Sequence, residues 1–110
     1  MVLWYYHRMT PQGTYNRLNK LLWRGRLPTA TVWFVSDATM PTNFGITMWD
    51  SDFRLPIIVI NASQKRWLKI LIHEILHIAE PEMPHGELFE SLVAFYVRAA
   101  KNTKRGYRTI

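Results

Sequence analysis

Apolar residues recur at helical spacing in the first part of the chain. In residues 14–24, Tyr15, Leu18 and Leu22 fall on one face of a helix. Gly25 follows directly, and glycine commonly occupies the position at which a helix ends. The pattern therefore predicts a helix over 14–24.

Three shorter segments carry the pattern of strands. Residues 30–36, 44–50 and 55–61 are rich in β-branched and aromatic side chains, and turn-forming residues separate them. The third segment, LPIIVIN, is apolar almost throughout, so we expect both of its faces to be covered. Gly45, near the start of the second segment, is interpreted as a turn or bulge glycine, or as a point where a substrate chain approaches closely.

Helical spacing returns in the second half of the chain. Asn61 and Ser63 predict the cap of a long helix over 64–78, which Pro81 ends. A last helix is predicted from Glu87 to about Lys101. Its spacing places four apolar residues on one side: Leu88, Leu92, Phe95 and Ala99.

This order of elements predicts an α+β domain. It has an N-terminal helix, a small three-stranded and mostly antiparallel sheet, and two helices after the sheet. A length of 110 residues suits one domain, 1–110, with a single modest core. From about residue 102 the chain is polar and leaves the periodic pattern, so this end is interpreted as a basic, flexible tail or a solvated chain end.

Composition narrows the chemistry and the location. The chain has no cysteine, so disulfides and thiolate metal sites are excluded and any zinc must be held by His, Asp or Glu. No apolar run approaches the roughly 20 residues that a membrane span needs. Arg8 follows the apolar start without a small-residue cleavage site, which disfavours a signal peptide. We therefore expect a cytoplasmic protein without a membrane partner.

The net charge of +6 has two interpretations. It provides solubility, or it attracts phosphate groups and other acidic partners such as DNA. The residues that would contact nucleic acid form two clusters: Arg17, Lys20, Arg24 and Arg26 near the first helix, and Lys101, Lys104, Arg105 and Arg108 in the tail.

The segment HEILH, residues 73–77, has the spacing of a metal site. Residues four apart project from one face of a helix, so His73 and His77 can both reach one zinc ion at roughly 2 Å. Glu74 lies beside the pair, where it can reach a water on the metal rather than the metal itself. Two ligands and a general base are what a zinc peptidase requires.

A third ligand is expected from the segment after the helix, with the fourth position left open for water. His85 is our choice, because the turn at Pro81 and Pro84 lets a later residue double back towards the helix. Glu87 and Glu90 are the alternatives, because a glutamate on the next helix supplies the third ligand in some zinc peptidases. A closed structural zinc would need a fourth protein ligand, from His7 or a carboxylate.

Three ordered segments, within about residues 14–100, carry a family resemblance. They are LNKLLWRGRLP (18–28), the three predicted strands with Gly-x-Thr at 45–47, and HEILH followed by HGELF (73–89). This set resembles the SprT-like zinc metallopeptidase domain, a minimal zincin related to Spartan. The resemblance implies one zinc ion held by His73, His77 and His85, with Glu74 as general base. The residues ESLVAFYVRAA (90–100) more weakly resemble a helix of ImmA-type peptidases, in which a glutamate is the third ligand.

The predicted function is therefore a zinc-dependent endopeptidase that hydrolyses protein or peptide substrates. Members of the resembled family act on proteins attached to DNA, which makes DNA-associated proteins the implied substrates and DNA an implied partner. We expect the substrate to lie extended along an exposed strand edge. Tyr96 and Tyr107 are the candidates for an oxyanion partner. The alternative is a non-catalytic, zinc-stabilised basic module that binds nucleic acid or protein, for which a base at Glu74 would serve no purpose.

Overall fold

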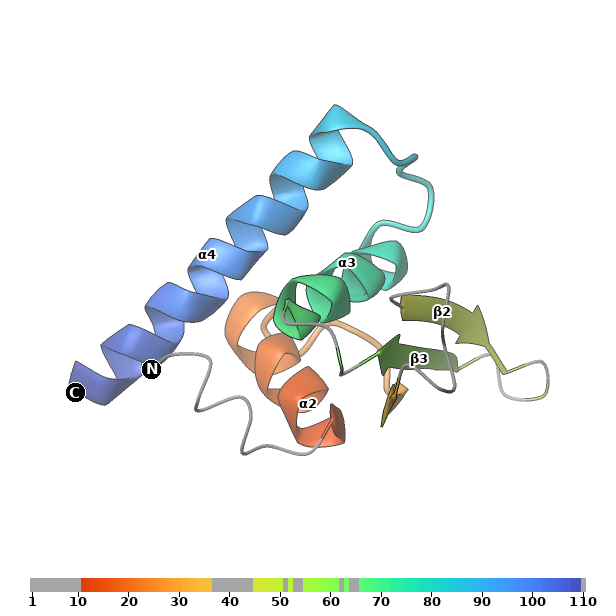
Figure 1. Ribbon diagram of the computed structural model, residues 1–110, viewed down its shortest axis with the longest axis horizontal. Helices are drawn as coiled ribbons and strands as arrows, with labels where there is room; N and C mark the ends of the chain where they lie inside the picture. The colour runs from red at the N-terminus through yellow and green to blue at the C-terminus, as the bar shows by residue number, and fades with distance from the viewer. Residues whose placement is uncertain are drawn as a thin grey trace.

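The computed structural model describes residues 11–36, 45–50, 52, 55–61, 63 and 66–109, and their side chains from 12 to 102. The α+β class is confirmed, with a helix, three strands and two further helices in that order (Figure 1). The elements are α2 (Pro11–Leu22), β1 (Thr31–Val35), β2 (Gly45–Trp49), β3 (Pro56–Asn61), α3 (Trp67–Ala79) and α4 (Glu87–Thr109). In the described part of the chain, no helix is both long enough and apolar enough to cross a membrane.

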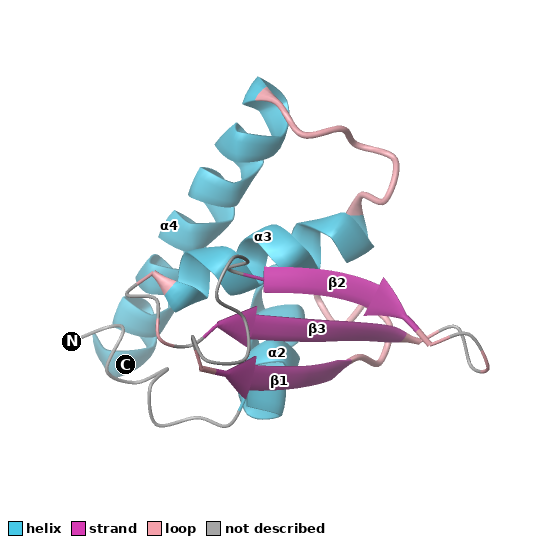
Figure 2. Cartoon of the chain, turned by 45° about the vertical axis from the view of Figure 1, so that its right-hand side comes forward, coloured by secondary structure: helices cyan, strands magenta, loops and turns pink. Residues whose placement is uncertain are grey.

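The three strands form a mixed sheet of order β1-β3-β2 (Figure 2). β2 pairs antiparallel with β3, but β1 pairs parallel with β3, so the prediction of a mostly antiparallel sheet was wrong for that pair. The last strand in the sequence inserts between the first two because it is the most apolar and is best suited to the central position. This order leaves β2 as an edge strand.

The core lies between one face of the sheet and the helices. α3 packs on β2 and β3, and α2 packs on β1 (Figure 2). Ile58 and Ile60 of β3 point into this core and are fully buried. Ile57 and Val59 alternate with them on the other face and are only half-buried, so the expectation that both faces of β3 are covered holds only in part.

Helix α2 starts three residues before the predicted position and ends as the glycine signal indicated. Arg24 and Gly25 both have positive φ angles, 55° and 77°, which turns the chain out of the helix. The Asn19 carbonyl accepts hydrogen bonds from the backbone N–H groups of Trp23 and Gly25, both at 3.0 Å. This end directs the chain into the extended segment that leads to β1.

Three polar side chains on one face of α2 hold that extended segment. Gln12, Tyr15 and Asn19 hydrogen-bond backbone groups of residues 27–32 at 2.7 to 3.3 Å. Burial raises the pKa of Tyr15 to about 12, so the phenol stays protonated. Its hydroxyl donates a hydrogen bond to the carbonyl of Pro28. α2 thereby fixes the position of β1.

Helix α3 begins at Trp67 rather than at the predicted residue 64, and its N-cap, Arg66, makes no side-chain capping bond. The predicted cap was wrong because Asn61 remains in β3, paired with Val35. The Asn61 side chain instead accepts a hydrogen bond from the Ser63 N–H at 3.0 Å.

Helix α4 starts at Glu87 as predicted but runs to Thr109, so residues 102–109 are helical rather than a tail outside the helix. They contain no proline, and Gly106 alone weakens a helix without necessarily ending it.

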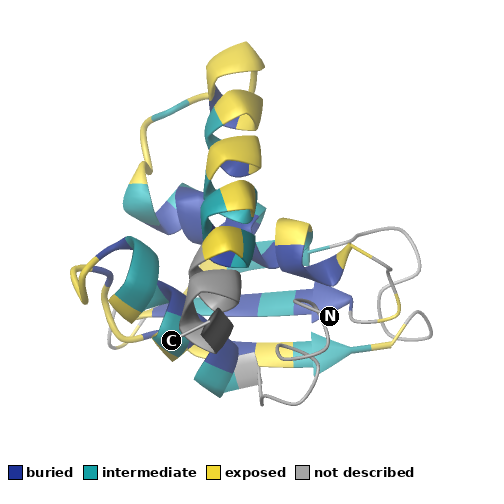
Figure 3. Ribbon diagram, turned by 90° about the vertical axis from the view of Figure 1, so that its left-hand side faces the viewer, coloured by how far each residue is buried: buried dark blue, intermediate teal, exposed yellow. Residues whose placement is uncertain are grey.

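The predicted buried side of α4 holds only in part: Leu92 and Ala99 are half-buried, and Leu92 packs against the core, whereas Leu88 and Phe95 are 64% and 57% exposed. Figure 3 shows this exposed side along the helix. The core instead receives Phe89, Val93 and Ala100, one residue further along.

Candidate metal centre

His73 and His77 lie one turn apart on the only polar stripe of a buried helix. Eight residues of α3 are buried, whereas the two histidines are half-buried and line a cleft. The buried residues are Trp67, Leu68, Leu71, Ile72, Glu74, Ile75, Leu76 and Ile78. Because the rest of α3 is fixed in the core, the two imidazoles are held on a rigid element.

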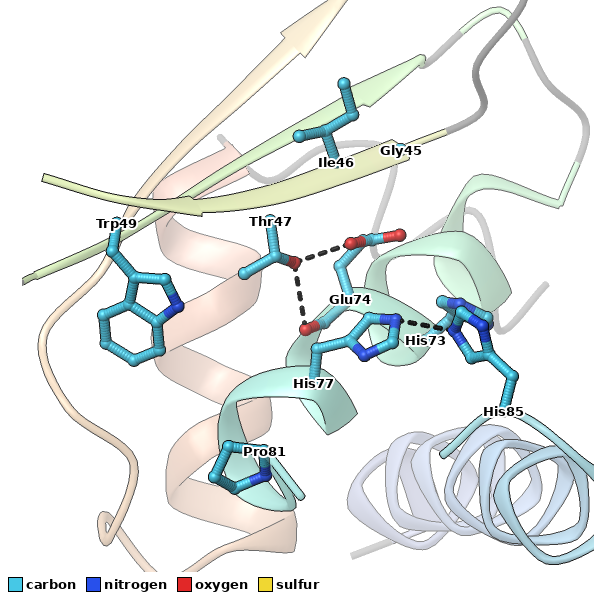
Figure 4. A pocket seen from close by; sticks show the side chains of 9 residues that line it. All are labelled: Gly45, Ile46, Thr47, Trp49, His73, Glu74, His77, Pro81 and His85. Atoms are coloured by element: carbon cyan, nitrogen blue, oxygen red, sulfur yellow. Dashed lines mark hydrogen bonds between the residues drawn. The ribbon is translucent and has the colours of Figure 1, made fainter. Parts of the chain in front are cut away.

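The turn after α3 returns His85 to the same place. Pro81 follows the end of the helix, and the Met83 N–H donates to the Glu80 carbonyl at 3.1 Å. His85 then lies in the connection before α4, and its Nε2 is 3.0 Å from Nε2 of His77 (Figure 4). The proline turn predicted from the sequence therefore brings the third histidine to the pair.

The three imidazoles fit a single metal ion. One ring nitrogen from each of His73, His77 and His85 lies within 4.8 Å of the others. Two nitrogens bound to one tetrahedral zinc ion, at roughly 2.0–2.1 Å each, would be separated by about 3.3–3.4 Å. The separation of 3.0 Å between Nε2 of His77 and Nε2 of His85 is close to this value. The separations within the group of three reach at most 4.8 Å, so rotation of the side chains would bring the third nitrogen to the same ion.

Phe89 packs against all three histidines. Its ring centroid lies 4.8, 4.9 and 5.0 Å from those of His73, His77 and His85, and its side chain is fully buried. The imidazole centroids are themselves 4.8 to 5.2 Å apart. Phe89 therefore restricts the orientation of each imidazole and joins the start of α4 to the site.

The electrostatic environment favours a neutral ligand at His77. Burial lowers the pKa of His77 below its usual value, Glu74 opposes this shift, and His73 and His85 lower the pKa further. A lowered pKa means that the ring loses its proton at a lower pH than a free imidazole does. His77 is therefore neutral at pH 7 and has a nitrogen lone pair for a metal.

Glu74 lies beside the imidazoles but belongs to a different set of contacts. It is 7% exposed, and its Oε1 accepts a hydrogen bond from the Thr47 hydroxyl of β2 at 2.6 Å (Figure 4). Its carboxylate is not among the converging ligand atoms. The sequence contained Thr47 within the Gly-x-Thr segment but gave no indication that it contacts Glu74, because the two residues are 27 positions apart.

Gly45 is required by close packing between β2 and α3. A Cβ atom at this position would lie 2.9 Å from Cγ2 of Ile70 and 3.1 Å from Cγ of Glu74. Both distances are shorter than ordinary van der Waals contact. Gly45 is thus neither a turn nor a bulge glycine but the place where the edge strand meets the helix that carries Glu74.

These residues line an open cleft of about 530 Å³ between β2 and α3. Gly45, Ile46, Thr47 and Trp49 form the β2 side, and Trp49 is 51% exposed. The other side carries the three histidines, Glu74 and Pro81. The cleft therefore combines an edge strand, a possible metal site and a buried carboxylate.

The alternative third ligands lie outside the converging group. Glu90 places its Oε2 4.0 Å from Nδ1 of His73, and Glu87 is exposed in the first turn of α4. Neither carboxylate belongs to the cluster of ligand atoms found among the described residues. His7, the suggested fourth ligand of a closed site, lies outside the described residues.

The predicted nucleic-acid contacts are located on other elements. Lys20, Arg24 and Arg26 are exposed at or just after the end of α2, whereas Arg17 and Lys101 are half-buried. Lys104, Arg105 and Arg108 are on the last turns of α4, with side chains outside the described residues. Lys101 is 14 residues from the start of α4, which corresponds to about 21 Å along the helix.

Of the two candidate oxyanion partners, the structure places the side chain of Tyr96 alone, and it lies away from the cleft residues. Tyr96 packs against Trp23, with ring centroids 4.5 Å apart, and is not among the cleft residues. The side chain of Tyr107 lies outside the described residues.

A comparison of three variants tests the third ligand. We expect His85→Ala to lose most of its zinc affinity, because a three-histidine site then keeps two ligands. Glu87→Gln and Glu90→Gln should retain zinc, and both preserve the size of the side chain. Zinc affinity is measured by competition with a chromophoric chelator. Retained affinity in His85→Ala together with a loss in either glutamine variant would assign the third ligand to a glutamate.

The structure confirms the cluster of His73, His77 and His85 as a group that could hold a metal ion. The spacing of His73 and His77, with His85 as the third member, resembles an HExxH-type site. The chain matches no family model, no curated protein and no solved structure.

Proposed function

We propose that the protein is a zinc-dependent endopeptidase. The observation that carries this proposal is the convergence of three imidazoles beside the buried carboxylate of Glu74 in one cleft. A structural metal site has no need of a carboxylate that is close to the ligands but not one of them. Three protein ligands with an open position are the arrangement of catalytic zinc sites.

Four residues of the cleft have a role in the proposed hydrolysis. His73, His77 and His85 would hold the zinc ion. The ion would supply Lewis-acid chemistry to the scissile carbonyl and would lower the pKa of water towards about 7. Glu74 accepts the proton of the attacking water and passes it to the nitrogen of the leaving amine. The amide C–N bond breaks, and the products are a carboxylic acid and an amine.

The edge strand β2 offers a way to bind an extended substrate. Among the described strands it pairs with β3 alone, and it forms one wall of the cleft. A peptide could add to its free edge by backbone hydrogen bonds, which bind many sequences because they do not involve side chains. This supports a protein substrate, and the resemblance to SprT-like peptidases extends the proposal to DNA-associated proteins.

Cleavage by the metal-loaded protein tests the proposed function. We expect zinc-loaded protein to cleave casein or histones, a chelator to abolish cleavage, and added zinc to restore it. Each assay is run with and without single-stranded DNA. Protein that contains one zinc per chain but cleaves neither substrate under any of these conditions would favour the alternative, a zinc-stabilised basic module that binds nucleic acid or protein.

DNA as a partner is proposed from the net charge of +6 and the basic clusters. If these residues contact phosphates, binding to DNA should weaken as salt rises, because each contact releases counterions. Replacing Lys104, Arg105 and Arg108 with glutamine should reduce the slope of log affinity against log salt by about 0.7 per lost contact on a single strand. Glutamine has a helix propensity similar to that of lysine and arginine, so α4 should remain intact. Replacing Lys20 and Arg24 with glutamine in the same way tests the cluster at the end of α2. Undetectable binding at low salt would leave the charge as a solubility feature.

A further inference from the structure

We propose that Thr47 is a positioning residue for Glu74, and this inference rests on the proposed peptidase function. Its hydroxyl is 2.6 Å from Oε1 of Glu74 and 3.2 Å from the backbone carbonyl of the same residue. A hydroxyl has one proton to donate, and the carboxylate is both the nearer and the stronger acceptor. Thr47 therefore donates to Oε1.

This contact divides the two carboxylate oxygens between two tasks. Oε1 is held by β2, whereas no group in the described part of the chain hydrogen-bonds Oε2. Oε2 therefore keeps its lone pairs free of the described groups, and we assign to it the acceptance of the water proton. The hydrogen bond fixes the side chain in one orientation, so that the base does not have to be reoriented during the reaction.

Gly45 and Thr47 act together because alternate residues of a strand share a face. Gly45 presents no side chain, and a Cβ there would come within 3.1 Å of Cγ and 3.2 Å of Oε2 of Glu74. Thr47 presents a hydroxyl two residues later. The Gly-x-Thr segment of β2 therefore leaves room for the Glu74 side chain at one position and binds its carboxylate at the next. Pairing of β2 with β3 fixes both positions relative to the sheet.

Two substitutions separate the hydroxyl from the shape of the side chain. Thr47→Val replaces the hydroxyl with a methyl group, and Thr47→Ser keeps the hydroxyl. In the zinc-loaded full chain, we expect Thr47→Val to lower kcat about 10-fold or more with little change in KM, since the base is misplaced while the substrate-binding strand is intact. Thr47→Ser should recover most of the lost kcat. Thr31→Val, on an exposed position of β1, is the control and should match wild type.

A metal-free readout tests the same contact. A hydrogen bond to a buried charged group stabilises the fold, so Thr47→Val should raise the unfolding equilibrium constant of the metal-free protein about 10-fold or more. Thr47→Ser should raise it much less. In a Glu74→Ala background the Thr47→Val substitution should have little effect, because its partner is already gone.

The outcomes distinguish this inference from the proposed function. If the wild type cleaves its substrate and Thr47→Val keeps the wild-type kcat, the positioning role is wrong while the peptidase function stands. An equal loss of kcat in Thr47→Val and Thr47→Ser would also overturn it, because the methyl group and not the hydroxyl would then matter. If the zinc-loaded wild type is inactive, the catalytic role of Thr47 falls with the proposed function, and the unfolding comparison still reports whether the contact exists.

Discussion

Replacing Glu74 with glutamine is expected to lower the rate of peptide cleavage by a factor of about 100 or more, as the loss of a general base usually does. The amide has nearly the shape of the carboxylate but cannot accept the water proton. The three histidines are unchanged, so zinc content should stay at the wild-type value. The measurement is kcat/KM on a fluorogenic peptide, with zinc determined on the same sample.

The fold of this variant should be preserved. The glutamine oxygen can still accept the hydrogen bond that Thr47 donates to Glu74, so we expect thermal stability close to that of the wild type. Glu82→Gln, in the exposed turn after α3, is the matched control and should cleave at the wild-type rate. A Glu74→Gln protein with normal zinc and normal activity would rule out Glu74 as the general base.

Replacing His73 or His77 with alanine is expected to remove both zinc and activity. A site with three protein ligands cannot lose one and keep its zinc affinity. Replacing a residue that only contacts a metal ligand lowers metal affinity by up to roughly 100-fold, and replacing a ligand itself should lower it by more. Zinc per chain is measured by mass spectrometry of metals after dialysis, and helical structure by circular dichroism.

The matched control for these variants is Lys69→Ala, which lies on the exposed part of the same helix and should retain zinc. Full zinc content in both histidine variants would show that α3 does not bind the ion. Loss of helical structure together with zinc would indicate instead that the histidines are needed for folding, and the Glu74→Gln result would then decide the function.

Local patterns predicted the elements of this fold better than their arrangement. Helical spacing placed His73 and His77 on one face of α3, and the β-branched segments became strands near their predicted positions. The parallel pairing of β1 with β3 was missed because strand order depends on contacts between distant segments. Leu88 and Phe95 were also wrongly predicted to be buried. Phe89 packs against the histidines, and with Phe89 on the inner side of α4 both Leu88 and Phe95 lie on the surface.

In the candidate site, too, local signals in the sequence predicted residues, whereas contacts between distant segments were missed. His85 was predicted because a proline turn limits where the chain can go after α3. Thr47 and Gly45 were not assigned a role in holding Glu74, because their contacts cross from β2 to α3 and leave no periodic signal in the sequence. Phe89 was visible only as a residue four positions after His85, and its contact with all three imidazoles requires the packing of α4 on α3.

X-ray absorption at the zinc edge tests the central claim most directly, because it reports the ligands of the ion without an assay of activity. We predict one zinc per chain, with three imidazole nitrogens at roughly 2.0–2.1 Å and one further oxygen from water. In His85→Ala, the number of imidazole ligands should fall from three to two. A spectrum with four protein ligands, or one that is unchanged in His85→Ala, would contradict an open three-histidine site.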